Sequence, residues 1–97
     1  MYLLEVLSGP LDGKTWSFER EITIGRDDKT AEACIALDRY VSRKHARLRA
    51  EGKTIVLTDL KSRNGTKLDG KDVTPDAHLD IGAPFVVGRT TLRVTRA

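Results

Sequence analysis

The sequence predicts an all-β domain, either a β-sandwich or a closed barrel. Ten short runs alternate apolar and polar residues or are rich in β-branched residues, as half-buried strands are. Eight glycines divide the chain, and the pairs Asp12-Gly13, Glu51-Gly52 and Asp69-Gly70 suit the tight turns of hairpins. No segment has the apolar spacing of a helix of three turns. About ten short strands with frequent turns are typical of a sandwich or a barrel.

The predicted strands follow one another along the whole chain. The clearest alternation lies in residues 53–59, where Ile55 and Leu57 share one face and the residues next to them share the other. Lys29–Ala33 is the best helical candidate, with one turn at most. No repeat, linker or low-complexity tract interrupts the pattern, so residues 1–97 are predicted to form a single domain. The ten runs are Tyr2–Leu7, Thr15–Phe18, Glu21–Gly25, Cys34–Leu37, Ala46–Ala50, Lys53–Asp59, Thr66–Leu68, Lys71–Thr74, Pro84–Gly88 and Thr91–Arg96.

Length and composition are those of one globular core. A chain of 97 residues and 10.8 kDa buries roughly two-thirds of the surface that its unfolded form exposes. With 39% apolar and 32% charged residues it is too apolar for a disordered chain. A single cysteine excludes an internal disulfide framework. No apolar run approaches the roughly 20 residues of a membrane span, and Glu5 interrupts the apolar start, which argues against a signal peptide. We therefore expect a cytoplasmic protein without membrane contact.

The basic residues are concentrated in two segments. Residues 39–49 hold five Lys or Arg and residues 61–67 hold three, with no acid in either, whereas the other 79 positions carry nine bases and 14 acids. The net charge of +3 therefore combines an acidic body, at −5, with two basic segments, at +8. This distribution favours a compact anion site over a broad polyanion-binding face.

Three short motifs occupy three predicted loops. In the first, Gly25 ends a strand and Arg26 follows at once, so that a guanidinium projects from a fixed position. In the second, Ser42 offers a hydroxyl to an oxyanion, and His45 lies where the chain enters the next strand. There we expect a buried, structural imidazole that bonds loop backbone groups. In the third, Asn64 precedes Gly65, which favours a tight turn, and its amide both donates and accepts, as reading an extended peptide requires.

The order and spacing of these motifs resemble the forkhead-associated domain, a family that binds phosphothreonine peptides. The family pattern of Gly-Arg, Ser-x-x-His and Asn-Gly is met by Gly25-Arg26, Ser42-x-x-His45 and Asn64-Gly65, with gaps of 16 from arginine to serine and 22 from serine to asparagine. The surrounding segments are also similar and extend the resemblance over essentially the whole chain; they are Ile22-Thr-Ile-Gly-Arg, Ile35-Ala-Leu-Asp, Val41-Ser-Arg, Leu57-Thr-Asp-Leu and Phe85-Val-Val-Gly.

The resemblance implies a two-sheet β-sandwich of about eleven mostly antiparallel strands, with the binding loops at one end. It implies that Arg26 and Ser42 contact the phosphate, that Asn64 holds the peptide backbone, and that the threonine methyl group occupies a small apolar notch. Arg43 matches a position that contacts the phosphate or the peptide. Gly25, His45 and Gly65 would shape the loops. Arg63 departs from the usual residue, which leaves open whether it meets the phosphate or an acidic side chain of the peptide.

The charge of the ligand agrees with this residue set. A phosphothreonine carries about −1.5 to −2 charges and three acceptor oxygens at neutral pH. One or two guanidinium groups and a hydroxyl suit such a group. Arg26, Ser42 and a second base, either Arg43 or Arg63, would supply them. The predicted function is therefore phosphothreonine-dependent binding of a protein or peptide in Ser/Thr kinase signalling, by a monomer that needs no cofactor.

Other functions are weighed against this one. Ser42 and His45, with Asp38 or Asp59, contain the residue types of a catalytic triad, but the chain has no long loops to build a cleft, so we expect no enzyme. Cys34, His45 and His78 share no metal-ligand spacing, and no metal site is expected.

Two binding alternatives also remain. A nucleic-acid-binding β-domain would interleave aromatic residues with its basic ones. Here aromatics are 5% of the chain, and only Tyr40 falls in a basic segment, so we expect no nucleic-acid binding. The second alternative is a domain of the same fold that binds an unphosphorylated protein partner through a sheet face.

Overall fold

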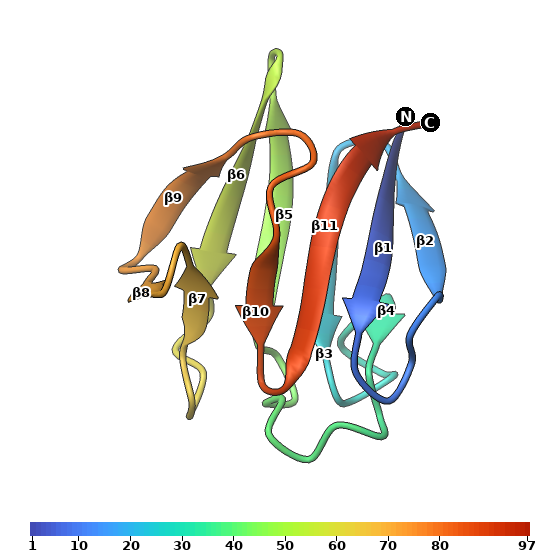
Figure 1. Ribbon diagram of the computed structural model, residues 1–97, viewed down its shortest axis with the longest axis vertical. Helices are drawn as coiled ribbons and strands as arrows, with labels where there is room; N and C mark the ends of the chain where they lie inside the picture. Colours follow the sequence, from blue (N-terminus) through green and yellow to red (C-terminus); the bar gives the residue numbers. More distant parts are fainter.

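The computed structural model describes all 97 residues as two β-sheets packed face to face (Figure 1). In spatial order, the six-stranded sheet contains β2 (Thr15–Phe18), β1 (Tyr2–Ser8), β11 (Thr90–Arg96), β10 (Phe85–Val87), β7 (Thr66–Leu68) and β8 (Lys71–Asp72). The five-stranded sheet contains β4 (Ala33–Cys34), β3 (Glu21–Gly25), β5 (Ala46–Glu51), β6 (Thr54–Asp59) and β9 (Asp76–Leu79). Only β3 and β4 pair in parallel. The sandwich of about eleven mostly antiparallel strands is confirmed, and the closed barrel is excluded.

Eight of the ten predicted strands agree with the structure to within one residue at each end. The predicted strand Cys34–Leu37 is wrong, because only Ala33 and Cys34 pair with β3 and the chain then turns, with the Asp38 amide donating to the Ile35 carbonyl at 3.3 Å. The predicted strand Lys71–Thr74 ends at Asp72.

Two further local features test the sequence patterns. Strand β9 was not among the ten runs, because aspartate and alanine are uncommon in strands; it forms through its pairing with β6. The segment after Arg26 makes a single turn, closed by a 2.9 Å hydrogen bond from the Ala31 amide to the Asp27 carbonyl. The structure contains no helix, hence none that is long and apolar enough to cross a membrane.

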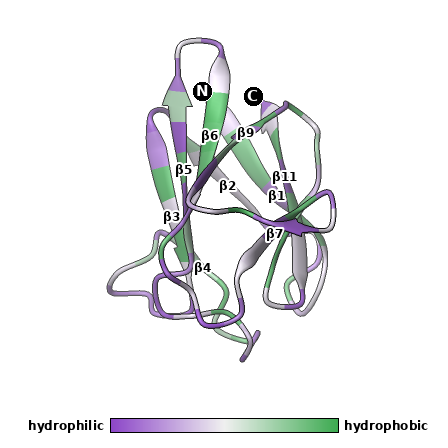
Figure 2. Ribbon diagram, turned by 90° about the vertical axis from the view of Figure 1, so that its left-hand side faces the viewer, coloured by the Kyte–Doolittle hydropathy of each residue, from purple (hydrophilic) through white to green (hydrophobic).

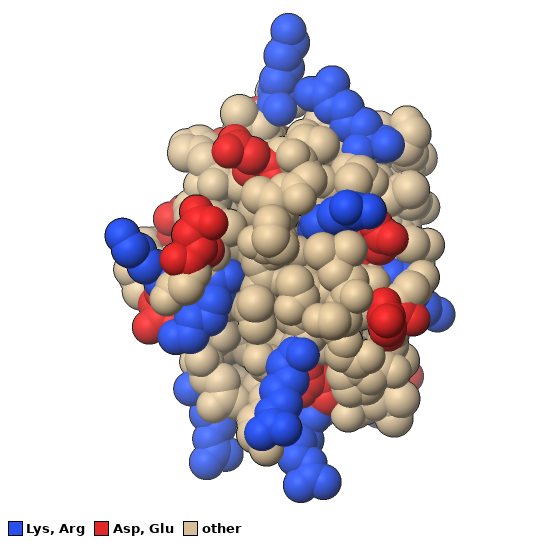
Figure 3. All heavy atoms as spheres, in the orientation of Figure 1, with Lys and Arg blue, Asp and Glu red and all other residues tan.

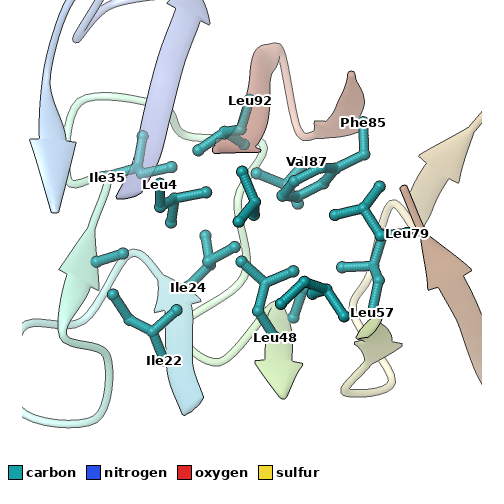
Figure 4. Packing of buried hydrophobic residues seen from close by; sticks show 14 of the residues in the cluster. Leu4, Ile22, Ile24, Ile35, Leu48, Leu57, Leu79, Phe85, Val87 and Leu92 are labelled. Atoms are coloured by element: carbon teal, nitrogen blue, oxygen red, sulfur yellow. The ribbon is translucent and has the colours of Figure 1, made fainter. Parts of the chain in front are cut away.

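The core lies between the two sheets and consists of 18 buried apolar residues. Leu4 and Leu92 extend from the six-stranded sheet toward Ile24 and Leu48 of the five-stranded one (Figure 4). Figure 2 shows hydrophobic residues along the strands of both layers. Burial of this apolar surface fixes the two sheets against each other, so that the loops project from a rigid frame.

The chain termini and the motif-bearing loops lie at opposite ends of the sandwich (Figure 1). The first and last strands pair along their length, from Tyr2 opposite Arg96 to Val6 opposite Leu92. The β3–β4, β4–β5 and β6–β7 loops extend from the other end, together with the β10–β11 turn. The loops are therefore free of the chain ends.

Replacement of a core leucine is expected to destabilise the fold much more than replacement of an exposed one. Leu57 is fully buried, whereas Leu37 is 70% exposed. Leu57→Ala should lower the free energy of unfolding by about 2–5 kcal/mol, because it removes buried methyl groups and leaves a cavity. Leu37→Ala should change it by less than about 0.5 kcal/mol. Urea titration followed by tryptophan fluorescence measures both, and equal losses would contradict the core assignment.

Candidate functional site

The end of β3 lies directly against the β4–β5 loop. A Cβ atom at Gly25 would stand 1.9 Å from the Arg43 carbonyl oxygen, so any larger residue would force the two segments apart. The Arg26 amide donates to the Ser42 carbonyl at 3.0 Å. Glycine is therefore required here by close packing. The exposed Arg26 side chain leaves the backbone beside Ser42 and Arg43.

His45 joins the β4–β5 loop to the β6–β7 loop. Its imidazole is fully buried; Nδ1 accepts from the Ser42 amide at 2.9 Å, and Nε2 lies 2.8 Å from the Gly65 carbonyl oxygen. Because an amide must donate and a carbonyl must accept, these partners define a neutral ring with its proton on Nε2. His45 thereby holds the Ser42 loop and the Gly65 loop at a fixed separation.

Burial lowers the pKa of His45 below its ordinary value of 6.5. The hydrogen bond to the Gly65 carbonyl and the negative charges of Asp59 and Asp38 oppose this shift, but desolvation is the largest effect. A second proton on the ring would also point Nδ1–H at the Ser42 N–H. The neutral form is therefore the one that the loop arrangement requires.

The Ser42 hydroxyl accepts a hydrogen bond and leaves its own proton unused within the protein. The Arg63 amide donates to Ser42 Oγ at 2.9 Å, which connects the two loops a second time. A hydroxyl has one donor in addition to its lone pairs. One acceptor position of the half-buried Ser42 hydroxyl is thus occupied by the Arg63 amide, and its proton has no acceptor within the protein.

Asn64 adds a third connection between the same loops. Its Nδ2 donates to the Tyr40 carbonyl oxygen at 2.8 Å, and its side chain is exposed. The Oδ1 atom accepts no hydrogen bond from the protein. Gly65 follows with a φ of +80°, a left-handed conformation that favours glycine.

Two acidic side chains hold the loops from within. Asp59, at the end of β6, accepts from the Ser62 amide at 3.1 Å, from the Ser62 hydroxyl, and from the Thr66 hydroxyl at 2.8 Å. These bonds fix the β6–β7 loop on both sides of Arg63 and Asn64. Asp59 is thus used by the loop and makes no hydrogen bond to His45.

Asp38 connects the β4–β5 loop to the β10–β11 turn. It is 2% exposed and accepts from the Tyr40 amide at 3.0 Å, the Arg89 amide at 2.8 Å and the Thr90 hydroxyl at 2.7 Å. The Arg89 guanidinium lies 4.2 Å from the centre of the Tyr40 ring, in a cation–π contact. Arg89 could not be assigned to the site from the sequence, because its contacts join residues about fifty positions apart.

The arginines of the site have no acidic partner. Arg26, Arg43 and Arg63 are exposed, and none takes part in the three ion pairs of the molecule. Figure 3 shows Lys and Arg side chains extending from the lower end, where the loops lie. A hollow of about 270 Å³ at this end is lined by Arg39, Tyr40, Arg63 and Asn64. The loops therefore present unpaired positive charge beside hydrogen-bonding groups.

The residue types of a catalytic triad are not arranged as one. Both ring nitrogens of His45 are engaged by backbone groups, and Ser42 Oγ accepts from an amide, so His45 is not placed to take a proton from Ser42. Cys34 Sγ donates to the Arg26 carbonyl at 3.5 Å. No three His, Cys, Asp or Glu side chains come together in a group suited to a metal ion.

A rigid β-sandwich that presents three interconnected polar loops at one end defines a class of loop-based binding domains. A family model described as the cytoplasmic domain of an inner-membrane component of the type III secretion system matches residues 5–97. The forkhead-associated domain-containing protein FhaB of Mycobacterium tuberculosis is 38% identical over 93 residues, which is 94% of this chain and 58% of that protein. The chain thus spans little more than half the length of this relative.

Solved structures of forkhead-associated domains are also similar to this chain. The forkhead-associated domain of the CT664 protein from Chlamydia trachomatis superimposes with a TM-score of 0.90 over 99% of this chain and 97% of that chain, at 22% identity, which shows the shared fold. A domain solved in a structural and functional analysis of phosphothreonine-dependent forkhead-associated domain interactions gives a TM-score of 0.83 at 29% identity, covering 99% and 96% of the two chains. The chain belongs to the forkhead-associated domain family.

Acidification is expected to destabilise the fold through His45. Because its pKa is lowered on folding, the unfolded chain takes up the proton first, so stability is fully present above about pH 6.5 and falls as the pH drops below it, by at most about 1.4 kcal/mol per pH unit. Urea titrations at a series of pH values measure the slope. His78, which is exposed, provides the control: His78→Gln should keep the slope. Loss of the slope in this variant would exclude His45 as its origin.

Proposed function

We propose that this domain is a non-catalytic module that binds phosphothreonine-containing proteins or peptides through the three loops. The observation that carries the proposal is the Ser42 hydroxyl, which accepts from the Arg63 amide and has its proton available. It lies in a loop that His45 holds through the Ser42 amide and that packs against Arg26. A phosphate dianion offers three acceptor oxygens to such donors. Membership of the family, and its similarity to a domain studied for phosphothreonine-dependent interactions, supports the same function.

The phosphate would be bound by a hydroxyl and by guanidinium groups that form no ion pair in the free protein. Arg26, Arg43 and Arg63 form no ion pair within the molecule, so binding breaks no internal salt bridge. Hydrogen bonds between charged groups are also shorter and stronger than neutral ones. Arg26 and Ser42 are assigned to the phosphate, with Arg43 or Arg63 as the second base.

The peptide backbone would be held by Asn64. Its Nδ2 is oriented by the Tyr40 carbonyl, which leaves Oδ1 to accept from a peptide N–H. Beyond Asn64 a peptide meets Tyr40, Arg39 and Arg89, which line a second hollow of about 370 Å³. The two arginines favour an acidic peptide residue on this side. The exposed Leu37 lines the same hollow and offers an apolar contact.

The family model supports a proposal for the cellular setting. The matching family model describes a cytoplasmic domain, and phosphothreonine is made where Ser/Thr kinases act. We therefore place the domain in the cytoplasm, where it binds as a monomer and uses no cofactor. An unphosphorylated partner bound on a sheet face is the alternative outcome of the tests below.

Removal of the Arg26 guanidinium should weaken phosphopeptide binding without unfolding the domain. Hydrogen bonds to charged groups contribute roughly 1.5–3 kcal/mol, so Arg26→Ala should raise the Kd by about 10- to 150-fold. Arg20→Ala is the matched control, because Arg20 is also exposed but lies outside the three loops. Calorimetric titration with one phosphopeptide measures both variants. Equal affinities of folded Arg26→Ala and the parent protein would remove Arg26 from the site.

Phosphothreonine should bind more tightly than phosphoserine in an otherwise identical peptide. Burial of the extra methyl group contributes roughly 0.8 kcal/mol, and the methyl also restricts χ1 of the free peptide, which lowers the entropy lost on binding. The combined effect is about 1.5–2.5 kcal/mol, or roughly 10- to 70-fold in Kd. Paired calorimetry at one pH and one salt concentration measures it. Both peptides carry the same charge. Equal affinities would therefore mean that the loops recognise the phosphate group but not the threonine methyl group.

A further inference from the structure

Asn64 is the single side-chain amide of the whole chain. The sequence contains no other asparagine and no glutamine, and the residue after Asn64 is glycine. In an Asn-Gly pair the next backbone nitrogen is not shielded by a side chain, so it can reach the amide carbon of the asparagine. Asparagine is among the thermally labile residues for this kind of reason. Any loss of ammonia from a side chain of this protein must therefore come from Asn64.

The loop leaves the Asn64 side chain exposed and the Gly65 N–H without a hydrogen-bond partner. Asn64 is exposed, and a single hydrogen bond, from Nδ2 to the Tyr40 carbonyl, restrains its amide. The backbone N–H groups of Ser62 and Arg63 are bonded to Asp59 and Ser42, whereas the Gly65 N–H donates to no group of the protein. The nitrogen that would attack therefore has no hydrogen bond within the protein to break first.

The backbone at position 65 disfavours a larger residue, which would shield the amide nitrogen and slow the reaction of Asn64. Its φ of +80° disfavours other residues, and a Cβ atom there would lie 3.0 Å from Asp72 Oδ1. The same geometry directs the Gly65 carbonyl to His45. The reactive pair is therefore a consequence of how the site is built.

We propose that Asn64 is a site of spontaneous deamidation that switches the binding site off. After solvent base removes the Gly65 amide proton, the nitrogen attacks Cγ of Asn64; the N–Cγ bond forms, the Cγ–Nδ2 bond breaks, and ammonia leaves with a proton from water. Water then opens the resulting succinimide at either carbonyl, giving aspartate or isoaspartate. The protein loses one ammonia and gains one water, without oxidation or reduction.

Both products would disrupt the loop contacts. A carboxylate has no N–H to donate to the Tyr40 carbonyl, and it places a negative charge beside the position assigned to the phosphate. Isoaspartate also lengthens the backbone, which moves the Gly65 carbonyl relative to His45 Nε2. The loss of binding rests on the proposed function, whereas the release of ammonia does not. A bound peptide that holds the Asn64 amide would protect it.

The experiment follows ammonia release and intact mass of the folded protein at mildly alkaline pH. A free peptide of residues 61–67 gives the rate without the fold, and Asn64→Asp gives the background. We expect at most one ammonia per chain, isoaspartate at position 64 by peptide mapping, and loss of phosphothreonine-peptide binding in step with it. A phosphopeptide at ten times its Kd should slow release about tenfold, since only the free fraction reacts.

The outcomes separate the two proposals. No release from the folded protein, while the free peptide converts fully, would overturn the inference, because the Tyr40 contact would then protect the amide. Binding that persists after complete conversion would overturn the switch. Release of ammonia from a protein that binds no phosphopeptide when fresh would establish the modification and count against the proposed function instead.

Discussion

The site depends on one buried imidazole that accepts at one nitrogen and donates at the other. His45 connects the Ser42 amide to the Gly65 carbonyl across two loops that are separated by strands β5 and β6 in the sequence. No side chain other than neutral histidine offers an acceptor and a donor at opposite sides of a rigid ring. Both partners are backbone groups: the Ser42 N–H can only donate a hydrogen bond, and the Gly65 carbonyl can only accept one. Burial, which disfavours the charged ring, therefore stabilises the form that holds the loops.

The groups that hold the loops together are different from the exposed charged groups that the loops present. The loops are held together by the buried imidazole of His45, the buried carboxylate of Asp38, the half-buried carboxylate of Asp59, and backbone amides. The guanidinium groups of Arg26, Arg43 and Arg63 make no hydrogen bond or ion pair within that framework. Preorganisation of this kind reduces the side-chain and loop ordering that binding would otherwise require. It also means that charge can be removed from the site without removing the contacts that shape it.

The strands and the motif positions could be predicted from the sequence because both are local patterns. Alternation such as that of Ile55 and Leu57 follows from the geometry of one strand, and the resemblance of three motifs supplied the order of the loops. Strand β9 could not be predicted, because its Asp76-Ala77-His78 run is shaped by pairing with β6. The Asp38–Arg89 connection could not be predicted either, since nothing in the sequence indicates which distant amide a buried carboxylate will accept from.

The charge distribution determines how far from the surface the site acts. Outside residues 39–49 and 61–67 the chain carries a net −5, so at a distance the acidic body offsets much of the field of the basic loops. At physiological ionic strength the Debye length is about 8 Å, and exposed charges farther away are largely screened. Long-range attraction of an anionic partner is therefore weak, and recognition has to come from contacts at hydrogen-bond distance. Arg63 is joined to Ser42 by a bond of 2.9 Å and Asn64 to Tyr40 by one of 2.8 Å, so the groups assigned to the proposed ligand are held in fixed positions. If the loops bind the proposed ligand, a site of this construction would discriminate by the shape and hydrogen-bonding pattern of the ligand more than by its total charge.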